Sequence, residues 1–288
     1  MTIKPLRFAS VLFRRTFFTD RCPSLAAAIS FYAILSFVPF VLLAASLLSH
    51  FSSSSEQAAQ DIIAFITANL PLSTSAAIEL ISTTVKGKTI VGIVSVVGLL
   101  WGSMSIFMEL EYDMNRIWRT VELRSAVRAS FVALLCIPFM ILFLLISLAL
   151  TGLISMAEQG IVPVLHIPLL KLPFVGTVIS FVVPIIVSTM LFTWIYYLLP
   201  SKWNHFKSAL YGALLASLLW EISKLLFDYY VSHLARFLTI YGSFTSIAVM
   251  FLWVYYSAFV VLLGAEFGAL LHETTTRGKM VEALREPL

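Results

Sequence analysis

Residues 173–199 read PFVGTVISFVVPIIVSTMLFTWIYYLL and contain no charged residue. An α-helix needs about 20 mostly apolar residues to cross the hydrocarbon core of a bilayer. A run of this length and composition is typical of a membrane span rather than of a strand or a short buried helix. The stretch therefore predicts a transmembrane helix, with a kink at Pro184, where the backbone loses a hydrogen bond.

Similar apolar runs recur on both sides of this stretch. The chain has 288 residues, of which 60% are hydrophobic and 12% charged, whereas soluble domains carry roughly 25% charged residues. We therefore expect an all-α, polytopic membrane protein that forms a single membrane domain over residues 1–288. Its spans, about six in number, are predicted at residues 24–49, 89–110, 129–157, 173–199, 208–231 and 244–271. The first of them carries Pro39, which marks a second kink.

Three segments outside the spans have patterns of their own. Residues 4–20 mix Phe and Leu with Lys and Arg, a composition typical of a helix that lies in the membrane interface. A disordered basic tail is the alternative. Residues 51–88 are polar, with apolar residues at helical spacing, and they predict short amphipathic helices on the extracytoplasmic side. Residues 272–288 form a polar C-terminal tail.

The distribution of basic residues sets the expected orientation. Fourteen of the 19 Lys and Arg residues lie in the N-terminal segment, the loops after the second and fourth spans, and the C-terminal tail. Because basic loops stay in the cytoplasm, both termini are predicted to be cytoplasmic. The two cysteines, Cys22 and Cys136, form no CxxC motif, and we expect no disulfide framework.

The fifth span carries charges that lipid would exclude. Ser217, Glu221, Lys224 and Asp228 recur every three or four residues and so share one stripe of a helix. Glu266, near the end of the sixth span, is a further carboxylate. Such residues usually face the interior of a bundle or a water-filled cavity. They are candidates for a polar transport pathway; a structural ion pair that orients the fifth span is the alternative.

A second polar group follows the second span. It is a candidate cytoplasmic gate that opens and closes by ion pairing, and it comprises Glu109, Glu111, Asp113, Asn115 and Arg116. The alternative is local pairing of the acidic residues with Arg116 or Arg119. Gly242, in the turn before the sixth span, is a candidate hinge alongside Pro39 and Pro184. Small residues at four-residue spacing, such as Gly98 with Gly102 and Gly264 with Gly268, predict close helix packing.

Four stretches, in order, resemble the YihY/BrkB family of bacterial inner-membrane proteins. They are LAAAISFYAILSFVP at 25–39, EYDMNRIW at 111–118, YYLLPSKW at 196–203 followed by GALLASLLWEISKLLFDYYV at 212–231, and YGSF at 241–244 followed by LWVYYSAFVVLLGAEFGALL at 252–271. The resemblance implies a transporter-like or envelope-maintenance role in the bacterial inner membrane. An older label for the family is ribonuclease BN, a tRNA-processing nuclease.

The residues favour transport over the other functions. The five histidines are isolated, and neither a metal-ligand cluster nor a catalytic triad is evident. We therefore expect no enzyme, no metal, no cofactor and no nucleic-acid partner. The leading hypothesis is movement of a lipid or a small anionic or amphiphilic substrate. The alternative is a non-transporting scaffold that docks periplasmic or inner-membrane envelope proteins through residues 51–88, and a nuclease is a distant third. Membrane lipids are the expected partners, and the sequence leaves homo-oligomerisation open.

Overall fold

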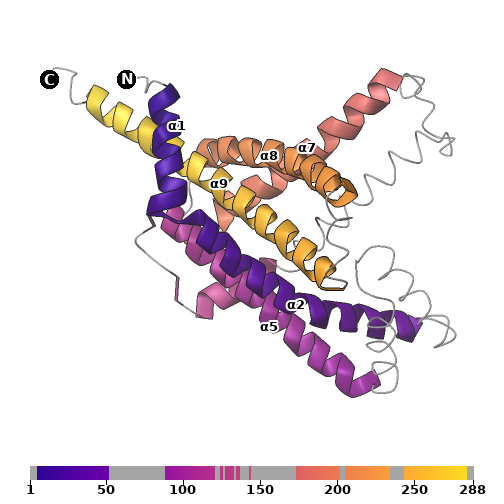
Figure 1. The fold of residues 1–288 in the computed structure, drawn as a ribbon. Helices are drawn as coiled ribbons and strands as arrows, with labels where there is room; N and C mark the ends of the chain where they lie inside the picture. Colours follow the sequence, from indigo (N-terminus) through magenta and orange to yellow (C-terminus); the bar gives the residue numbers. More distant parts are fainter. Residues whose placement is uncertain are drawn as a thin grey trace, which may run out of the picture. The chain divides into compact units, whose positions relative to one another are not determined.

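The computed structural model is helical throughout the part of the chain that it describes, with no strand in that part (Figure 1). The described residues are 5–51, 88–120, 124–125, 127–132, 134–136, 143, 173–201, 205–233 and 243–283. The helices are α1 (Pro5–Arg14), the π-helical turn η1 (Arg15–Thr19), α2 (Cys22–Phe51), α5 (Lys88–Ile117), α7 (Pro173–Leu198), α8 (Phe206–His233) and α9 (Ser243–Ala283).

Two stretches of helix are long and apolar enough to cross a membrane, among the residues that the structure describes. They are Phe206–Phe227 in α8 and Ala248–Thr276 in α9, with shorter apolar helices at Cys22–Ser36, Val127–Cys136 and Val182–Leu198. Large apolar side chains are exposed along them, for example Leu225 at 61% and Met190 at 62%. Side chains of this kind need an apolar surrounding. The fold is that of a helical membrane protein. The count of six spans stays a prediction.

The helix bounds follow the predicted spans closely where both are described. The predicted span at 173–199 is α7, and the spans at 24–49 and 208–231 lie within α2 and α8. The helices α5 and α9 extend further, to Ile117 and Ala283, so part of the predicted polar tail is helical. Both α2 and α7 continue through their prolines, Pro39 and Pro184. The segments 52–87 and 158–172, Gly242 and most of the span at 129–157 lie outside the described residues.

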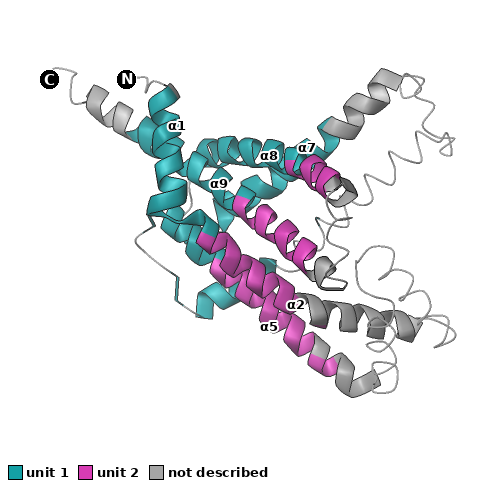
Figure 2. Ribbon diagram, in the orientation of Figure 1, with its two compact units in different colours: residues 1–23, 110–222, 260–288 teal, residues 24–109, 223–259 magenta. Residues whose placement is uncertain are grey.

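The chain divides into two compact units, which Figure 2 distinguishes by colour. Unit 1 comprises residues 1–23, 110–222 and 260–288, and unit 2 comprises residues 24–109 and 223–259. In unit 2, α2 and α5 pack closely. A Cβ atom added at Gly98 would lie only 3.1 Å from Cγ of Pro39. Gly102 faces Ser36 in the same way. The predicted packing role of the small residues in α5 is therefore confirmed.

In unit 1, glycines bring α8 and α9 together. A Cβ atom at Gly212 would lie 2.6 Å from the carbonyl oxygen of Gly264, so that the backbone would have to shift to accept one. The same holds at Gly268, where a Cβ atom would lie 2.8 Å from the carbonyl oxygen of Ser208. Only residues without a side chain allow the two backbones to approach this closely. Tyr196 of α7 joins the contact by donating a hydrogen bond of 2.6 Å to the carbonyl of Val261 in α9.

Candidate functional site

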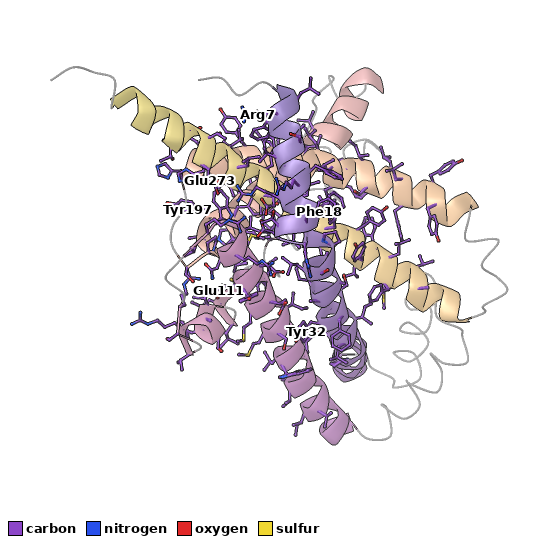
Figure 3. The ribbon with its side chains drawn as sticks, turned by 60° about the vertical axis from the view of Figure 1, so that its left-hand side comes forward. Arg7, Phe18, Tyr32, Glu111, Tyr197 and Glu273 are labelled. Atoms are coloured by element: carbon purple, nitrogen blue, oxygen red, sulfur yellow. The ribbon has the colours of Figure 1, made fainter. Side chains whose placement is uncertain are left out.

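The N-terminal segment, residues 5–20, packs against α9 within unit 1. The ring of Phe8 meets Phe267 edge-on, with 5.5 Å between centroids. Arg15 is buried, with 8% of its surface exposed. Figure 3 shows the side chains of this region, with Arg7 and Phe18 labelled on the segment and Glu273 on α9. The segment is thus anchored to the protein as well as suited to the membrane interface.

Arg15 reaches two carboxylates of α9. Its Nε atom lies 3.2 Å from Oε2 of Glu266, and its Nη1 atom lies 3.0 Å from Oε2 of Glu273. The spacing of seven residues places both carboxylates on the same face of the helix, about two turns apart. Glu266 is fully buried, whereas the side chain of Glu273 is 37% exposed. Glu266, predicted as part of a polar pathway, is therefore in contact with a guanidinium group from the N-terminal segment.

Asp20 ends the N-terminal segment and forms a two-pronged contact with Arg119. The Nη1 and Nη2 atoms of Arg119 donate hydrogen bonds of 2.6 and 2.7 Å to the two oxygens of Asp20. Arg116 adds a longer contact, with 3.6 Å between Nε and Oδ1 of Asp20. Burial alone would raise the pKa of Asp20, but the hydrogen bonds and charge of Arg119 contribute to a net lowering below the ordinary value of 3.8.

The backbone at the end of α5 aims Arg119 at Asp20. The N–H of Thr120 donates to the carbonyl of Asn115, and the N–H of Arg119 donates to the carbonyl of Arg116, which together form a Schellman motif. Arg119 occupies the left-handed position of this motif, with φ of 54°. Glycine usually fills that position because it has no Cβ atom to clash. We name these contacts the N-terminal cluster: Arg15, Asp20, Arg116, Arg119, Glu266 and Glu273.

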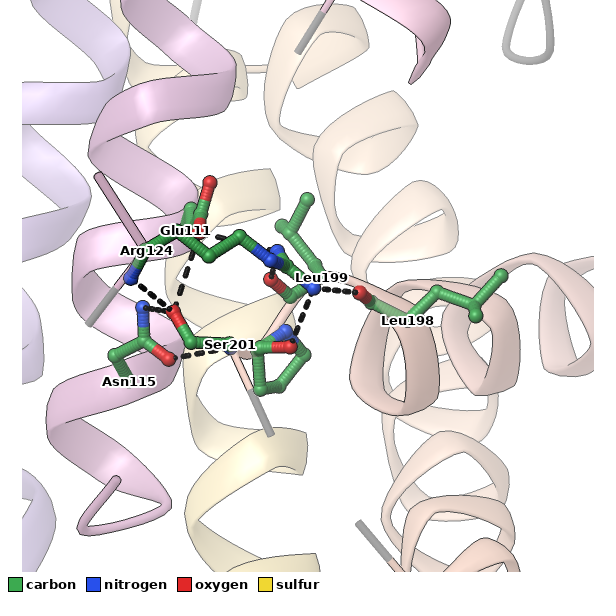
Figure 4. A network of polar contacts seen from close by, with 7 residues as sticks. Glu111, Asn115, Arg124, Leu198, Leu199 and Ser201 are labelled. Carbon is green, nitrogen blue, oxygen red and sulfur yellow. Dashed lines mark hydrogen bonds and ion pairs between the residues drawn. The ribbon is translucent and has the colours of Figure 1, made fainter. Parts of the chain in front are cut away.

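A second network, the Arg124 cluster, joins the end of α5 to the end of α7 (Figure 4). Arg124 lies 3.0 Å from Oε1 of Glu111 and donates hydrogen bonds to the carbonyls of Leu198, Leu199 and Pro200, of 3.2, 2.8 and 3.0 Å. The last carbonyls of a helix have no partner within it. Arg124 therefore caps α7 and neutralises the buried Glu111 with one side chain.

Asn115 and Ser201 complete the Arg124 cluster. The amide nitrogen of the Asn115 side chain donates to the hydroxyl of Ser201 at 3.0 Å, and Oδ1 of Asn115 accepts from the backbone N–H of Ser201 at 2.7 Å. The N–H of Arg124 also donates to the Ser201 hydroxyl, at 3.2 Å. These contacts connect two stretches that lie far apart in the sequence, EYDMNRIW at 111–118 and YYLLPSKW at 196–203.

The predicted gate is thus divided between the two clusters. Glu111 and Asn115 belong to the Arg124 cluster, while Arg116 contacts Asp20. Asp113 is fully buried, and Glu109 lies in the other compact unit. The alternative of local pairing is wrong for Glu111, whose partner is Arg124 rather than Arg116 or Arg119. The pairing of Arg119 with Asp20 was not predicted either, because these residues are 99 positions apart.

The predicted polar stripe of α8 is partly connected to α7. The hydroxyl groups of Ser217 and Thr189 share a hydrogen bond of 2.8 Å, and both residues are buried. Glu221 lies one turn further along α8, half-buried, and its Oε1 atom is inaccessible to solvent. Lys224 is also half-buried, and the side chain of Asp228 is not among those that the structure describes. The transport role of these residues stays a prediction.

Sequence reasoning did not identify Arg15, Asp20, Arg124 and Ser201 as site residues. Asp20 offered a signal, since it is the one acidic residue among positions 1–23, in a strongly basic stretch. The others resemble ordinary residues of a basic interface. Within the described part of the chain, no group of three or more His, Cys, Asp or Glu side chains is placed to hold a metal ion.

Comparisons with known proteins identify the family. The family described as "Virulence factor BrkB" matches residues 13–286. A UPF0761 membrane protein of Vibrio atlanticus is 31% identical, over 95% of this chain and 86% of that protein. One from Haemophilus influenzae is 27% identical, over 93% of this chain and 96% of its own.

A relative from Ralstonia nicotianae, also named a UPF0761 membrane protein, is 28% identical over 88% of this chain, and the match spans only 56% of that longer protein. No solved structure matches the chain. The extent of the family match, over nearly all of the sequence, agrees with the four stretches of resemblance. The chain belongs to the BrkB/YihY family of membrane proteins.

Proposed function

We propose that this protein is a transporter-like protein of the bacterial inner membrane that moves a lipid or a small anionic or amphiphilic substrate. The observation that carries the proposal is Glu266, a fully buried carboxylate within the apolar stretch Ala248–Thr276, in contact with Arg15. An ionisable side chain inside an apolar span costs a few kcal/mol or more on insertion. Ionisable residues that are kept inside a span despite this cost usually serve a substrate or ion pathway.

The two clusters supply the gate in this proposal. Their charges come from the N-terminal segment, the end of α5, the loop after it and α9, and every carboxylate in them has a guanidinium partner within 4 Å, as in the pairs Arg15–Glu266 and Arg124–Glu111. Ion pairs can exchange partners without unfolding a helix. A change of partners at these helix ends would open a path, with both termini on the cytoplasmic side.

The exposed side of the N-terminal segment suits a lipid or amphiphilic substrate. Leu6 is 86% exposed and Phe18 is 70% exposed, and the rings of Phe13 and Phe17 pack at a tilt of 35° with 4.7 Å between centroids. The exposed side chains of Arg7 and Arg14 lie in α1, which also carries Leu6 and Phe13. Aromatic and basic residues together favour the boundary between lipid head groups and acyl chains.

The scaffold is the alternative function, and it depends on residues 51–88. Nothing in the described residues favours it. It predicts that polar substitutions at Ile62, Phe65 and Ile66 abolish function in cells while the purified protein stays intact. It also predicts that crosslinkers placed in this segment capture a periplasmic partner.

Reconstitution into liposomes tests the two functions against each other. Wild-type protein is expected to move fluorescently labelled lipids or small anionic solutes, and Glu221→Gln and Glu266→Gln are expected to slow this movement at least tenfold. Glu273→Gln is the matched comparison, because Glu273 shares the guanidinium group of Arg15 with Glu266 but is partly exposed, so its loss should slow movement less than the loss of Glu266.

Liposomes in which wild-type protein moves nothing would contradict the proposal. Equal rates for wild type, Glu221→Gln and Glu266→Gln would contradict the role of both buried carboxylates. Protein that moves nothing but captures a partner through residues 51–88 would establish the scaffold instead.

A further inference from the structure

The N-terminal segment carries an apolar stripe on the side that faces away from α9. Leu6 and Phe13 are seven residues apart, so they share one face of α1, and Leu6 lies about 200° round the helix from Phe8, the residue that contacts α9. Ring contacts extend the stripe, because the centroids of Phe17 and Phe18 lie 4.7 and 6.2 Å from that of Phe13. Phe13 is 57% exposed and Phe18 is 70% exposed. An apolar stripe of this kind needs an apolar partner.

Two arginines run alongside the stripe. Arg7 and Arg14 follow Leu6 and Phe13 by one position and are also seven residues apart, which places their Cα atoms about 10 Å from each other along α1. Both side chains are exposed. Neither guanidinium group forms an ion pair with a carboxylate of the residues that the structure describes. Their two positive charges are therefore available to an anionic partner.

The segment offers these arginines no counter-charge of its own. Asp20 is the one acidic residue among positions 1–23. It is 1% exposed, and its two oxygens accept hydrogen bonds of 2.6 and 2.7 Å from Arg119. The outward side thus combines apolar rings with positive charge. We call it the aromatic–arginine face, and it comprises Leu6, Arg7, Phe13, Arg14, Phe17 and Phe18.

Contacts on the opposite side hold this face in place. The ring of Phe8 meets Phe267 with 5.5 Å between centroids, and Arg15 lies 3.2 Å from Glu266. The segment is already folded and fixed to α9, so a ligand at the aromatic–arginine face does not have to order it first. Binding energy lost to ordering a flexible chain is saved in such a site.

We propose that the aromatic–arginine face is a docking surface for anionic phospholipids of the membrane in which the protein lies. The guanidinium groups bind the phosphates, and the rings lie between the head groups and the acyl chains. A zwitterionic phospholipid fits less well, because its head group carries a cation beside the phosphate. The lipid is a bound partner here and not cargo, so this inference does not rest on the proposed transport.

A fluorescence titration of the purified full-length protein tests the docking surface. Ser10 is exposed between Arg7 and Arg14, and Ser10→Cys can carry a polarity-sensitive dye, since the native Cys22 and Cys136 are buried. The labelled protein in neutral detergent is titrated with phosphatidylglycerol or with phosphatidylcholine. We expect a blue shift that reaches half its amplitude at a phosphatidylglycerol concentration at least tenfold below that of phosphatidylcholine, and that added salt weakens.

Substitution of the two arginines measures their share of the binding. A basic residue at an anionic membrane surface contributes about fivefold in affinity, so Arg7→Gln with Arg14→Gln should raise the half-saturating phosphatidylglycerol concentration at least tenfold. The matched control is Arg128→Gln with Lys207→Gln, which removes the same charge from two exposed positions elsewhere and should leave the titration unchanged. Circular dichroism and gel filtration establish that each variant is folded.

Three results would overturn the proposal. They are equal responses to phosphatidylglycerol and phosphatidylcholine, an unchanged titration in the folded Arg7→Gln, Arg14→Gln variant, and the same blue shift with inorganic phosphate in place of lipid. The titration involves no movement of substrate across a membrane. Protein that binds phosphatidylglycerol but moves nothing in liposomes would therefore contradict the proposed transport alone, and the reverse result would contradict the docking surface alone.

Discussion

The contact between Asp20 and Arg119 predicts an asymmetric response to mutation. The side chain of Asp20 is 2% exposed and that of Arg119 is 42% exposed. Removing one partner of a fully buried pair costs about 3–5 kcal/mol, because the other charge stays buried. In Arg119→Gln the buried Asp20 is left behind, with Arg116 as a weaker partner at 3.6 Å. We therefore expect a loss of about 2–3 kcal/mol.

The reverse substitution leaves the exposed partner. In Asp20→Asn, Arg119 can turn towards water, and the expected loss is about 1 kcal/mol. Arg119→Gly separates the loss of the side-chain contact from the strain of the backbone, since glycine adopts the left-handed conformation with φ of 54° without strain. It should therefore be more stable than Arg119→Gln by about 1 kcal/mol.

Denaturant unfolding of the purified variants in detergent gives the free energy of unfolding of Arg119→Gln, Asp20→Asn and Arg119→Gly, each compared with the wild type. The double variant Asp20→Asn with Arg119→Gln measures the coupling between the two residues. The reasoning fails if Asp20→Asn is as destabilising as Arg119→Gln, or if the effects of the two substitutions simply add.

Further predictions concern pH, the Arg124 cluster and the packing of α8. Because the pKa of Asp20 is lowered in the folded protein, its contribution to stability is present above the ordinary value of 3.8 and is lost as the pH falls through the lowered pKa; acid unfolding curves of Asp20→Asn should lack this loss. Arg124→Lys removes the planar fork and should cost about 2 kcal/mol in denaturant unfolding, against less than about 0.5 for the exposed control Arg128→Lys. Gly212→Ala should cost about 1–3 kcal/mol through overpacking, whereas the control Leu214→Ala, at an exposed position of the same helix, should cost less in the same measurement.

The positions of the helices were largely predictable because lipid imposes a simple rule. A spanning segment must satisfy all its backbone hydrogen bonds internally, so a long apolar run becomes a helix. This rule places α7, at Pro173–Leu198, within one residue of its predicted end at 199. It does not determine where a helix ends in water. The helices α5 and α9 therefore extend beyond the predicted spans into polar residues.

The candidate site was predictable only in part, for a different physical reason. Glu111, Asn115 and Glu266 stand out in the sequence because polar residues beside apolar spans are costly. Their partners do not stand out, since an arginine in a basic loop is expected in any membrane protein. The contact of Asn115 with Ser201 joins residues 86 positions apart. Only the packing of the helices brings such residues together, and no local pattern in one sequence encodes it.

We expect the N-terminal segment to connect the charged cluster to the membrane surface. A helix that only lay on the membrane would gain nothing from burying Arg15, because desolvation of a guanidinium group is costly without partners. Glu266 and Glu273 provide those partners and hold one side of the segment on α9. Its other side exposes Phe13 and Phe18, which we expect to meet lipid. A change of charge at Glu266 would therefore alter how the segment is held and, through it, how these aromatic residues contact the bilayer.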